Sequence, residues 1–486
     1  MIQRNKEFRV LKNNQIQDLA ELGVDDLTKG YGEGRFSPVD ATRAALARIE
    51  AFNDQVNAFC LVDAKAALAA AAESEKRWQE GHPLGPIDGV PTSIKDTVQA
   101  RGWTSTMGSN VFTMTGPSKT DGSVTARLRE AGAVLLGLTC SPEIGWKGVT
   151  DSPRHGVTRN PWDTARTPGG SSGGAAAAAA LGMGCLHVGT DAGGSIRIPA
   201  AFSGVFGHKP SFGRVPNTPP SPFSTLSHTG PITRNVRDAA LMLDVLASPD
   251  PTDWYSLPPI SGTFADALDG GIKGLRIAWS PSLGGNLLDP QLATTLATAM
   301  KDLAALGGEF IEAEPDMSDA REIFEAFWFA AVAWRLDGLS EAELDALDPG
   351  LRALQARTGR LTLLEYQEQA QQRMALAARL NSFMEDYDLL ITPTLPITAF
   401  EAGRDVPATG PYTDWWDWAA FCYPFNLTRL PAASIPCGQV NGLPVGLQIV
   451  GRRFDDATVL RAAHALESQR PPAFPQHPRP ASAAGH

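Results

Sequence analysis

The sequence is poor in the residues that would place it in several common classes of protein. Only five of its 486 residues are cysteines; they are widely spaced and form no C-x-x-C pair. Neither a disulfide framework nor a zinc site is therefore expected, and we expect no metal and no cofactor. Each cysteine is expected to be a small buried apolar residue, and a cytoplasmic location is the simplest setting.

Charge and hydropathy argue against two kinds of partner. The net charge is −11, and lysine and arginine are not clustered into the basic patch that nucleic-acid binding requires. The opening residues, MIQRNKEFRVLKNNQ, lack the apolar core of a signal peptide. The longest weakly polar run, residues 173–189, is mostly Ala and Gly and too short for a membrane span. We therefore expect no nucleic-acid partner and no membrane segment.

The sequence does have a regular alternation of helix-type and strand-type stretches. Residues 1–80 favour helices, including one that starts at Ser37 as N-cap and Pro38 as first residue, and are expected to form a helical layer packed on the core. Short strand-type runs follow at 133–138, 185–190, 275–280, 388–394, 432–438 and 446–451, with helix-type stretches at 122–131, 173–182, 236–247, 288–305 and 363–385. This pattern predicts an α/β sheet covered by helices on both faces. Residues 471–486, rich in Pro and Ala, predict a disordered tail.

Three serines lie among glycines in TPGGSSGGAAAAAA (167–180) and GTDAGGSIRIPA (189–200). The first stretch, with Ser171 and Ser172, precedes a predicted helix, and it can be interpreted simply as a loop that caps that helix. It also contains G-x-S-x-G, but this nucleophile elbow requires a preceding strand, and NPWDTARTPGG is a poor strand. The histidines that the elbow would need, His228 and His464, have no suggestive context. No lysine follows the glycines, so a phosphate-binding loop is disfavoured as well.

The second stretch favours Ser195 as an acyl-transfer nucleophile. It leaves a predicted buried strand, and Ala192, Gly193 and Gly194 place backbone N–H groups just before the serine, as an oxyanion hole requires. A nucleophile also needs a base. Lys95, in GVPTSIKD, can serve only if burial lowers its pKa and leaves the amine neutral; by composition alone it is more readily interpreted as a surface ion-pair residue.

These residues resemble the amidase signature family. The resemblance rests on GVPTSIKD, TPGGSSGG and GTDAGGSIRIPAAFSGVFGHKPSFGRVP, in that order, and it extends over nearly the whole chain. It implies an α/β fold with a mixed central β-sheet covered by helices on both faces, over residues 81–470. It also implies a Ser-Ser-Lys triad, in which Ser195 is the nucleophile, Ser171 the bridging serine after a cis peptide bond, and Lys95 the base.

The resemblance implies further roles around this triad. Ser172 has a supporting role, and Gly145 lines the substrate carbonyl with its backbone. Asp191 and Arg197 organise the loop of the nucleophile. Lys209, in GHKPSFG, is the alternative base. Residues 137–146, GLTCSPEIGW, depart from the Lys-Thr-Asn that many members carry, which leaves the shape of the substrate side open.

The function implied is hydrolysis of a carboxylic amide to an acid and ammonia or an amine. The partner is a small-molecule amide, and a homodimer stays open as the assembly. The aromatic segments 323–335 and 412–426 are interpretable as core packing or as an apolar acyl pocket; the second interpretation favours hydrophobic or aryl amides. The alternatives are the glutaminase subunit of a tRNA-dependent amidotransferase, a non-catalytic binding protein of the same fold, and an α/β-hydrolase esterase.

Overall fold

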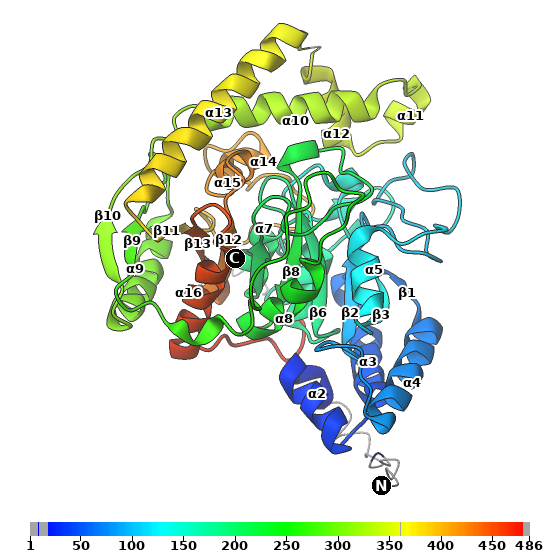
Figure 1. Cartoon of the computed structure of the whole chain (residues 1–486). Helices are drawn as coiled ribbons and strands as arrows, with labels where there is room; N and C mark the ends of the chain where they lie inside the picture. The colour runs from blue at the N-terminus through cyan, green and yellow to red at the C-terminus, as the bar shows by residue number, and fades with distance from the viewer. Residues whose placement is uncertain (1–7, 9–17, 360, 480–486) are drawn as a thin grey trace, which may run out of the picture.

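An eleven-stranded β-sheet runs through the molecule (Figure 1). The computed structural model describes residue 8, residues 18–359 and residues 361–479. The strands of the large sheet are β1 (Phe59–Val62), β2 (Pro91–Lys95), β3 (Val134–Thr139), β6 (Leu186–Asp191), β7 (Phe206–Lys209), β8 (His228–Thr233), β9 (Arg276–Trp279), β10 (Glu309–Glu312), β11 (Leu389–Pro393), β12 (Ala432–Val440) and β13 (Leu443–Gly451). A separate small sheet pairs β4 (Asp151–Ser152) with β5 (Gly156–Val157).

The strand order is β1-β3-β2-β6-β8-β7-β12-β13-β11-β9-β10. Strand β2 runs parallel to both β3 and β6, whereas β8 is antiparallel to β6, and β12 is antiparallel to β7 and β13. The sheet is therefore mixed, as the family resemblance implies. The parallel trio β3-β2-β6 matters for function, because β2 and β6 carry candidate site residues to the same edge.

Helices cover both faces of this sheet, as predicted. The α-helices are α2 (Val24–Glu33), α3 (Pro38–Val56), α4 (Ala64–Glu80), α5 (Ser123–Glu130), α6 (Gly173–Ala180), α7 (Arg197–Ser203), α8 (Val236–Leu246), α9 (Pro290–Ala305), α10 (Ala320–Leu336), α11 (Glu341–Asp345), α12 (Pro349–Arg357), α13 (Leu363–Glu385), α14 (Trp415–Trp418), α15 (Pro424–Leu427) and α16 (Asp456–Gln469). Successive strand residues point to opposite faces. Accordingly Ala432 and Val450 join the core under α7, while Ala433 and Ile449 join the core under α8, α9 and α16.

The alanine-rich helix α6 is buried along its whole length. Its small side chains let it approach the sheet closely: a Cβ at Gly174 would lie 2.4 Å from the carbonyl oxygen of Ala58. A helix that is apolar on all sides is expected in the interior. Helix α6 thus holds its N-terminal end, with Ser171 and Ser172 just before it, at a fixed place in the core.

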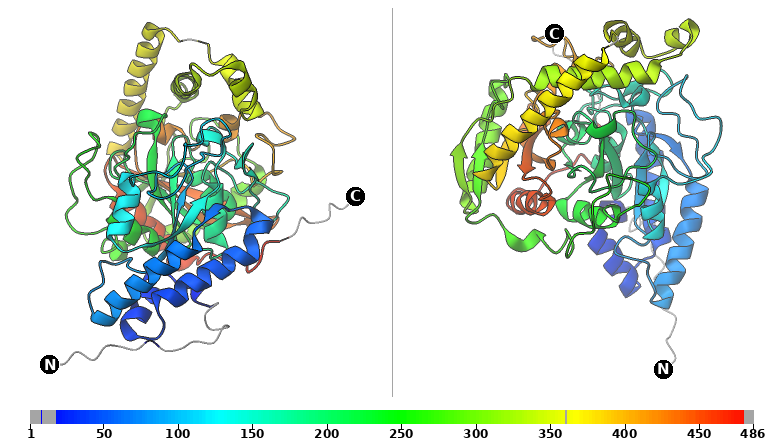
Figure 2. Two further views of the ribbon diagram at one scale, coloured as in Figure 1. Left: turned by 90° about the vertical axis from the view of Figure 1, so that its right-hand side faces the viewer. Right: turned by 45° about the horizontal axis from the view of Figure 1, so that its top comes forward.

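Helices α10–α13 form an outer layer at one end of the molecule, at the opposite end from the N-terminal helices α2–α4 (Figure 2). The aromatic residues of 323–335 and 412–426 meet beneath this layer. Trp328, Trp415, Trp416 and Trp418 are all buried there, with Phe324 stacked on Tyr423 at 4.4 Å. Most of these aromatic residues therefore pack the core, which agrees with the core-packing interpretation of the two segments.

Both ends of the described chain contain more structure than the sequence indicates. Residues 59–62 form the edge strand β1 within a region expected to be purely helical. Residues 471–479, for which the composition predicts disorder, lie against the body of the protein. Arg479 exchanges backbone hydrogen bonds of 3.0 Å with Pro161 and Thr164, and Phe474 lies under Arg234. Residues 480–486 of the predicted tail lie outside the described residues. Within the described part, no helix is long and apolar enough to cross a membrane.

Candidate active site

Lys95 and Ser171 lie in direct contact. Lys95 is the last residue of β2 and is fully buried. Its Nζ donates a 2.6 Å hydrogen bond to Ser171 Oγ and a 2.9 Å hydrogen bond to Thr190 Oγ1. Thr190 directly precedes Asp191 in the second serine stretch, but no sequence pattern marked it as a site residue. Two neighbouring parallel strands, β2 and β6, thus bring together groups that are far apart in the sequence.

The amine of Lys95 is easily deprotonated. Burial lowers its pKa from the ordinary lysine value to about 7, against the opposing effect of the carboxylates of Asp191 and Asp96. Burial also lowers the pKa of Lys209 to about 7. However, Lys209 Nζ donates to the carbonyl oxygens of Leu430 and Pro210. The lowered pKa therefore does not show which of the two lysines is the better candidate base. The contacts favour Lys95, because of these two lysines only Lys95 contacts a hydroxyl of the serine stretches.

The loop before Ser171 is shaped by its glycines. The peptide bond between Gly170 and Ser171 is cis, as the resemblance implies, and Gly169 has a φ of +81°. A Cβ at Gly170 would lie 2.3 Å from the carbonyl oxygen of Val149. The described chain contains no strand between β5 and α6, so the nucleophile-elbow interpretation of Ser171 is wrong. Thr150 Oγ1 holds this loop in place by donating to Gly169 O and accepting from Gly173 N.

Ser171 and Ser195 line the same cavity, of about 240 Å³, together with Gly145, Thr190 and Ala192. Ser172 ties the two serine stretches together: its N–H donates to Ser195 O at 3.2 Å, and its Oγ contacts the backbone of Thr190. Within the described residues, the Ser195 hydroxyl makes no hydrogen bond. Ser195 as a whole residue is 4% exposed, and because it lines the cavity its hydroxyl is available to a molecule bound there.

The turn before Ser195 differs in one respect from expectation. The N–H of Gly194 donates to Asp191 Oδ1 at 2.8 Å, so this amide is already engaged. Position 194 instead requires a glycine for its conformation, because its φ is +125° and a Cβ there would lie 2.7 Å from the Cβ of Cys422. In the part of the chain that the structure describes, the N–H groups of Gly193 and Ser195 carry no hydrogen bond.

Gly145 lines the cavity beside Ser171. It belongs to a short 3-10 helix, Glu143–Gly145, and its φ is +76°. A Cβ there would lie 3.3 Å from Ser171 Oγ. A side chain at position 145 would therefore crowd the hydroxyl that contacts Lys95.

A buried ion pair holds the turn of Ser195. Arg197 makes two hydrogen bonds to Asp191, Nε to Oδ2 at 2.9 Å and Nη2 to Oδ1 at 3.0 Å. Burial alone would raise the pKa of Asp191, but the Arg197 guanidinium holds it well below its usual range. Asn426, which no sequence pattern marked as a site residue, donates to both the carbonyl and the carboxylate of Asp191. Asp191 and Arg197 thus act on the turn by positioning it.

The two histidines of the esterase alternative do not contact the serines. His228 Nδ1 lies 2.8 Å from the carbonyl oxygen of Leu226 and 3.2 Å from that of Asp191. His464 lies on α16 near Asp269 and Glu467. In the described structure neither histidine hydrogen-bonds Ser171, Ser172 or Ser195, which argues against a Ser-His mechanism.

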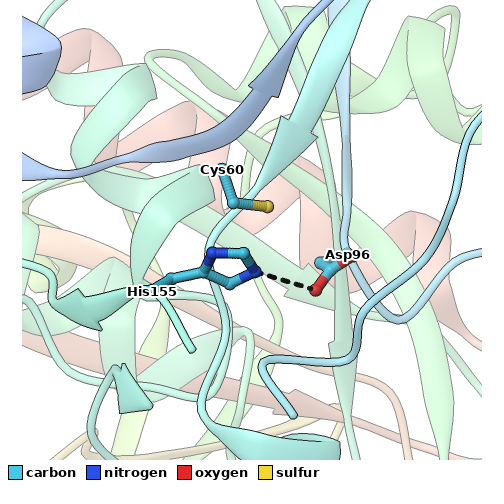
Figure 3. A group of neighbouring side chains, drawn as sticks. All are labelled: Cys60, Asp96 and His155. Carbon is cyan, nitrogen blue, oxygen red and sulfur yellow. Dashed lines mark ion pairs between the residues drawn. The ribbon is translucent and has the colours of Figure 1, made fainter. Parts of the chain in front are cut away.

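One group of potential metal ligands occurs among the described residues. The ligand atoms of Cys60, Asp96 and His155 lie within 4.8 Å of one another, and the side chains point toward a common centre (Figure 3). However, the hydroxyl of Thr106 lies between two of them, 2.5 Å from Asp96 Oδ2 and 2.6 Å from His155 Nε2. The backbone N–H of Gly108 also donates to Asp96 Oδ2, at 2.9 Å. Asp96 and His155 are therefore better described as part of a hydrogen-bonded network that fixes the loop after Lys95, whereas the Cys60 thiol donates to the carbonyl oxygen of Leu138.

The geometry agrees with comparisons to known proteins. A family model described as Amidase matches residues 40–460. The chain is 36% identical over 464 residues to an acylamidase of Rhodococcus erythropolis, covering 94% of this chain and 97% of that protein. It is 35% identical over 483 residues to a glutamyl-tRNA(Gln) amidotransferase subunit of Chloroflexus aggregans, covering 93% of this chain and 97% of that one.

Solved structures give the same result. A bacterial aryl acylamidase of the amidase signature family has a TM-score of 0.86 and 29% identity, covering 93% of this chain and 96% of its own. A 6-aminohexanoate cyclic dimer hydrolase complexed with substrate has a TM-score of 0.84 and 29% identity, covering 93% and 98%. The chain therefore belongs to the amidase signature family, and it is a hydrolase that acts on the carbon–nitrogen bonds of amides.

Proposed function

We propose that the chain hydrolyses a carboxylic amide through an acyl-enzyme on Ser195, with Ser171 and Lys95 as the proton relay. The observation that carries this proposal is the 2.6 Å contact between Lys95 Nζ and Ser171 Oγ, at the wall of the cavity that also contains Ser195. A buried amine with a pKa of about 7 is a suitable general base at neutral pH.

The first half of the reaction forms the acyl-enzyme. The lone pair of neutral Lys95 accepts the proton of Ser171, and Ser171 accepts the proton of Ser195 as the Ser195 Oγ attacks the amide carbonyl carbon. The C–N bond then breaks, and the proton held on Lys95 returns through Ser171 to the leaving nitrogen. The amine departs with its bonding electron pair and the proton, and the acyl group stays as an ester on Ser195.

The second half uses the same groups on water. Water loses a proton to the relay and attacks the ester, and the released Ser195 Oγ regains a proton from Ser171. In both halves the carbonyl oxygen becomes negative. The free N–H groups of Gly193 and Ser195 are the donors that we assign to it, with Ala192 beside them on the cavity wall. Gly194 takes part through its conformation, since Asp191 engages its N–H.

The lining of the cavity favours hydrophobic or aryl amides. Apolar side chains of Met107, Ile144 and Phe223 surround it, and Trp334 and Arg335 of α10 contribute to its rim. Trp334 is 69% exposed, in contrast to the buried tryptophans of the same segment. The relatives that are acylamidases support the same substrate class.

A substrate panel tests this proposal. The purified chain is assayed on acetamide, benzamide, an acetanilide, an aryl ester and a carbamate. We expect turnover of the anilide and benzamide above that of acetamide, and loss of turnover by at least about 10³-fold in Ser195→Ala with unchanged folding. Higher activity on acetamide than on both aromatic amides would contradict the substrate class; an active Ser195→Ala variant would contradict the mechanism.

The glutaminase subunit of a tRNA-dependent amidotransferase is the second candidate. Relatives at 34–35% identity over more than nine-tenths of this chain are subunits of glutamyl-tRNA(Gln) amidotransferases. Glutamine as the preferred substrate, together with stimulation by a partner complex, would favour it.

A non-catalytic binding protein is disfavoured, because Lys95, Ser171 and Ser195 are all present. A cytoplasmic location and a homodimer remain parts of the proposal.

A further inference from the structure

Arg335 has the only charged side chain among the described residues that line the active-site cavity. The other lining residues are apolar or carry neutral polar groups, and no aspartate, glutamate, lysine or histidine is among them in the described chain. Arg335 is the second-last residue of α10 and follows the exposed Trp334 at the rim. The cavity lining thus carries one positive charge, which the mechanism above does not use.

The guanidinium of Arg335 has no hydrogen-bond or ion-pair partner among the described residues. Its Nε is enclosed and unpartnered, whereas Nη1 and Nη2, which also make no hydrogen bond, are not among the enclosed atoms and stay accessible. Burial lowers the pKa of Arg335, and no described carboxylate opposes this effect, although a guanidinium remains charged at neutral pH. By contrast Arg321, the other arginine of α10, forms ion pairs with Glu325 at 2.9 Å and Asp417 at 2.8 Å.

The two interactions that Arg335 does make leave its N–H groups free. Its Cζ lies 4.2 Å from the ring centroid of Phe112, a distance at which the ring face attracts a cation. Arg335 also belongs to the last turn of α10, where the helix dipole favours positive charge. Neither interaction supplies a hydrogen-bond acceptor to the guanidinium. A partly buried cation with unused donors is therefore held at the wall of the cavity.

We propose that Arg335 is a specificity-determining residue that binds a carboxylate group of the amide substrate. The N–H groups of a guanidinium form a planar fork that matches the two oxygens of a carboxylate. A substrate with an ammonium group is disfavoured, because no acidic side chain of the described residues lines the cavity to pair with it. The inference rests on the proposed function for the bond that is cleaved, and it narrows the substrate to an amide whose acyl half or amine half is an anion.

Two pairs of aryl amides test the proposal on the full chain. 4-Acetamidobenzoate, with its carboxylate on the amine half, is compared with the neutral 4-acetamidoacetophenone. 4-Carbamoylbenzoate, with its carboxylate on the acyl half, is compared with the neutral 4-acetylbenzamide. The values of kcat and KM are measured for the wild type, Arg335→Gln and Arg335→Lys, and the ratio of kcat/KM within a pair is compared between variants. This comparison cancels the intrinsic reactivity of the amides and the overall activity of each variant.

Arg429→Gln is the matched control. Arg429 is also partly buried, its pKa is likewise lowered by burial, and its Cζ lies 4.5 Å from the ring centroid of Phe212, but it does not line the active-site cavity. The control therefore removes an arginine from a similar environment without changing the charge of the cavity wall.

We expect Arg335→Gln to lower the ratio of carboxylate to neutral amide by about tenfold in one pair, mainly through KM, as the loss of a hydrogen bond between charged groups implies. Arg335→Lys, which keeps the charge, should lower it less, and Arg429→Gln should leave it at the wild-type value. The pair that responds shows which half of the substrate carries the carboxylate. An unchanged ratio in both pairs of Arg335→Gln, or an equal decrease in Arg429→Gln, would overturn the proposal.

Isothermal titration separates this proposal from the proposed function, because it needs no turnover. The two carboxylates and their neutral analogues are titrated into Ser195→Ala and into the double variant that also carries Arg335→Gln. One carboxylate should bind about tenfold more weakly to the double variant, and its neutral analogue should bind the two proteins more nearly alike. Such a difference without hydrolysis of any amide by the wild type would overturn only the proposed function. Hydrolysis of amides without any carboxylate preference that depends on Arg335 would overturn only the present inference.

Discussion

Lys95 Nζ and Ser171 Oγ lie 2.6 Å apart, although 75 residues separate them in the sequence. Strand β2 delivers the amine, and the glycine loop before α6 delivers the hydroxyl. The contact places an amine with a pKa of about 7 beside a hydroxyl in a cavity that also contains Ser195.

The rate should depend on pH through Lys95. The amine acts as a base only when neutral, so kcat/KM should rise with pH through an acid limb near pH 7, where burial places the pKa. Below that pH the protonated amine cannot accept from Ser171. A pH profile of kcat/KM on a neutral amide measures the limb.

Replacement of Lys95 tests the same assignment directly. Lys95→Ala should lower kcat by at least about 10³-fold and remove the limb. Lys209→Ala is the control, because Lys209 has a similarly lowered pKa but contacts carbonyl oxygens. If Lys95→Ala retained near-normal rates, the relay would be excluded; if only Lys209→Ala removed the limb, the base would be Lys209.

Thr190 should tune the amine. Its Oγ1 accepts a hydrogen bond from Lys95 Nζ, and such a bond is stronger for the charged amine than for the neutral one. Thr190→Val should therefore lower the pKa of Lys95 and move the acid limb to lower pH, by about one unit. Thr190→Ser, which keeps the hydroxyl, should leave the limb in place. A shift toward higher pH in Thr190→Val would contradict this role.

Local patterns in the sequence predicted much of the fold. The six strand-type runs correspond to β3, β6, β9, β11, β12 and β13, and the capped helix at Ser37 and Pro38 is present with a capping box to Asp40. Strands β1, β2, β7, β8 and β10 of the large sheet escaped prediction. Three of them have four residues each, and β8 contains both Gly230 and Pro231, so their stability comes from pairing within the sheet.

The site was less predictable than the fold, for a different reason. The resemblance pointed to Lys95, Ser171 and Ser195, but the burial that lowers the pKa of Lys95 is a property of the whole assembled core. The hydrogen bond of the Gly194 N–H depends on the direction in which the Asp191 carboxylate points. Asn426 lies 235 residues after Asp191 in the sequence. Such contacts between distant residues leave no local pattern in a single sequence.

Gly170 should tolerate no side chain. A Cβ there would lie 2.3 Å from the backbone oxygen of Val149, which cannot move without displacing the loop of Ser171. We expect Gly170→Ala to lower both thermal stability and kcat, with stability reduced by about 1–3 kcal/mol as for other overpacked sites. Gly85→Ala is the control, since its nearest contact is an ordinary 3.9 Å. Equal stability and activity in the two variants would show that the loop is adaptable.

The buried ion pair of Asp191 with Arg197 holds the turn of Ser195. Asp191→Asn keeps the shape of the side chain but leaves the buried Arg197 without its counter-charge, and breaking such a pair costs about 3–5 kcal/mol. Urea unfolding should show this loss. The exposed pair of Glu33 with Arg35 provides the matched control: Glu33→Gln should change stability by less than about 1 kcal/mol.

The same variant has a second readout that a purely structural role would not give. The charge of Asp191 raises the pKa of Lys95, in opposition to burial. Asp191→Asn should therefore move the acid limb of kcat/KM to lower pH, whereas Glu33→Gln should leave it in place. A variant that lost stability but kept the wild-type limb would show that Asp191 supports the turn of Ser195 without setting the charge of the base. A variant that moved the limb in the predicted direction would place the carboxylate, the amine and the two serines in one electrostatic unit.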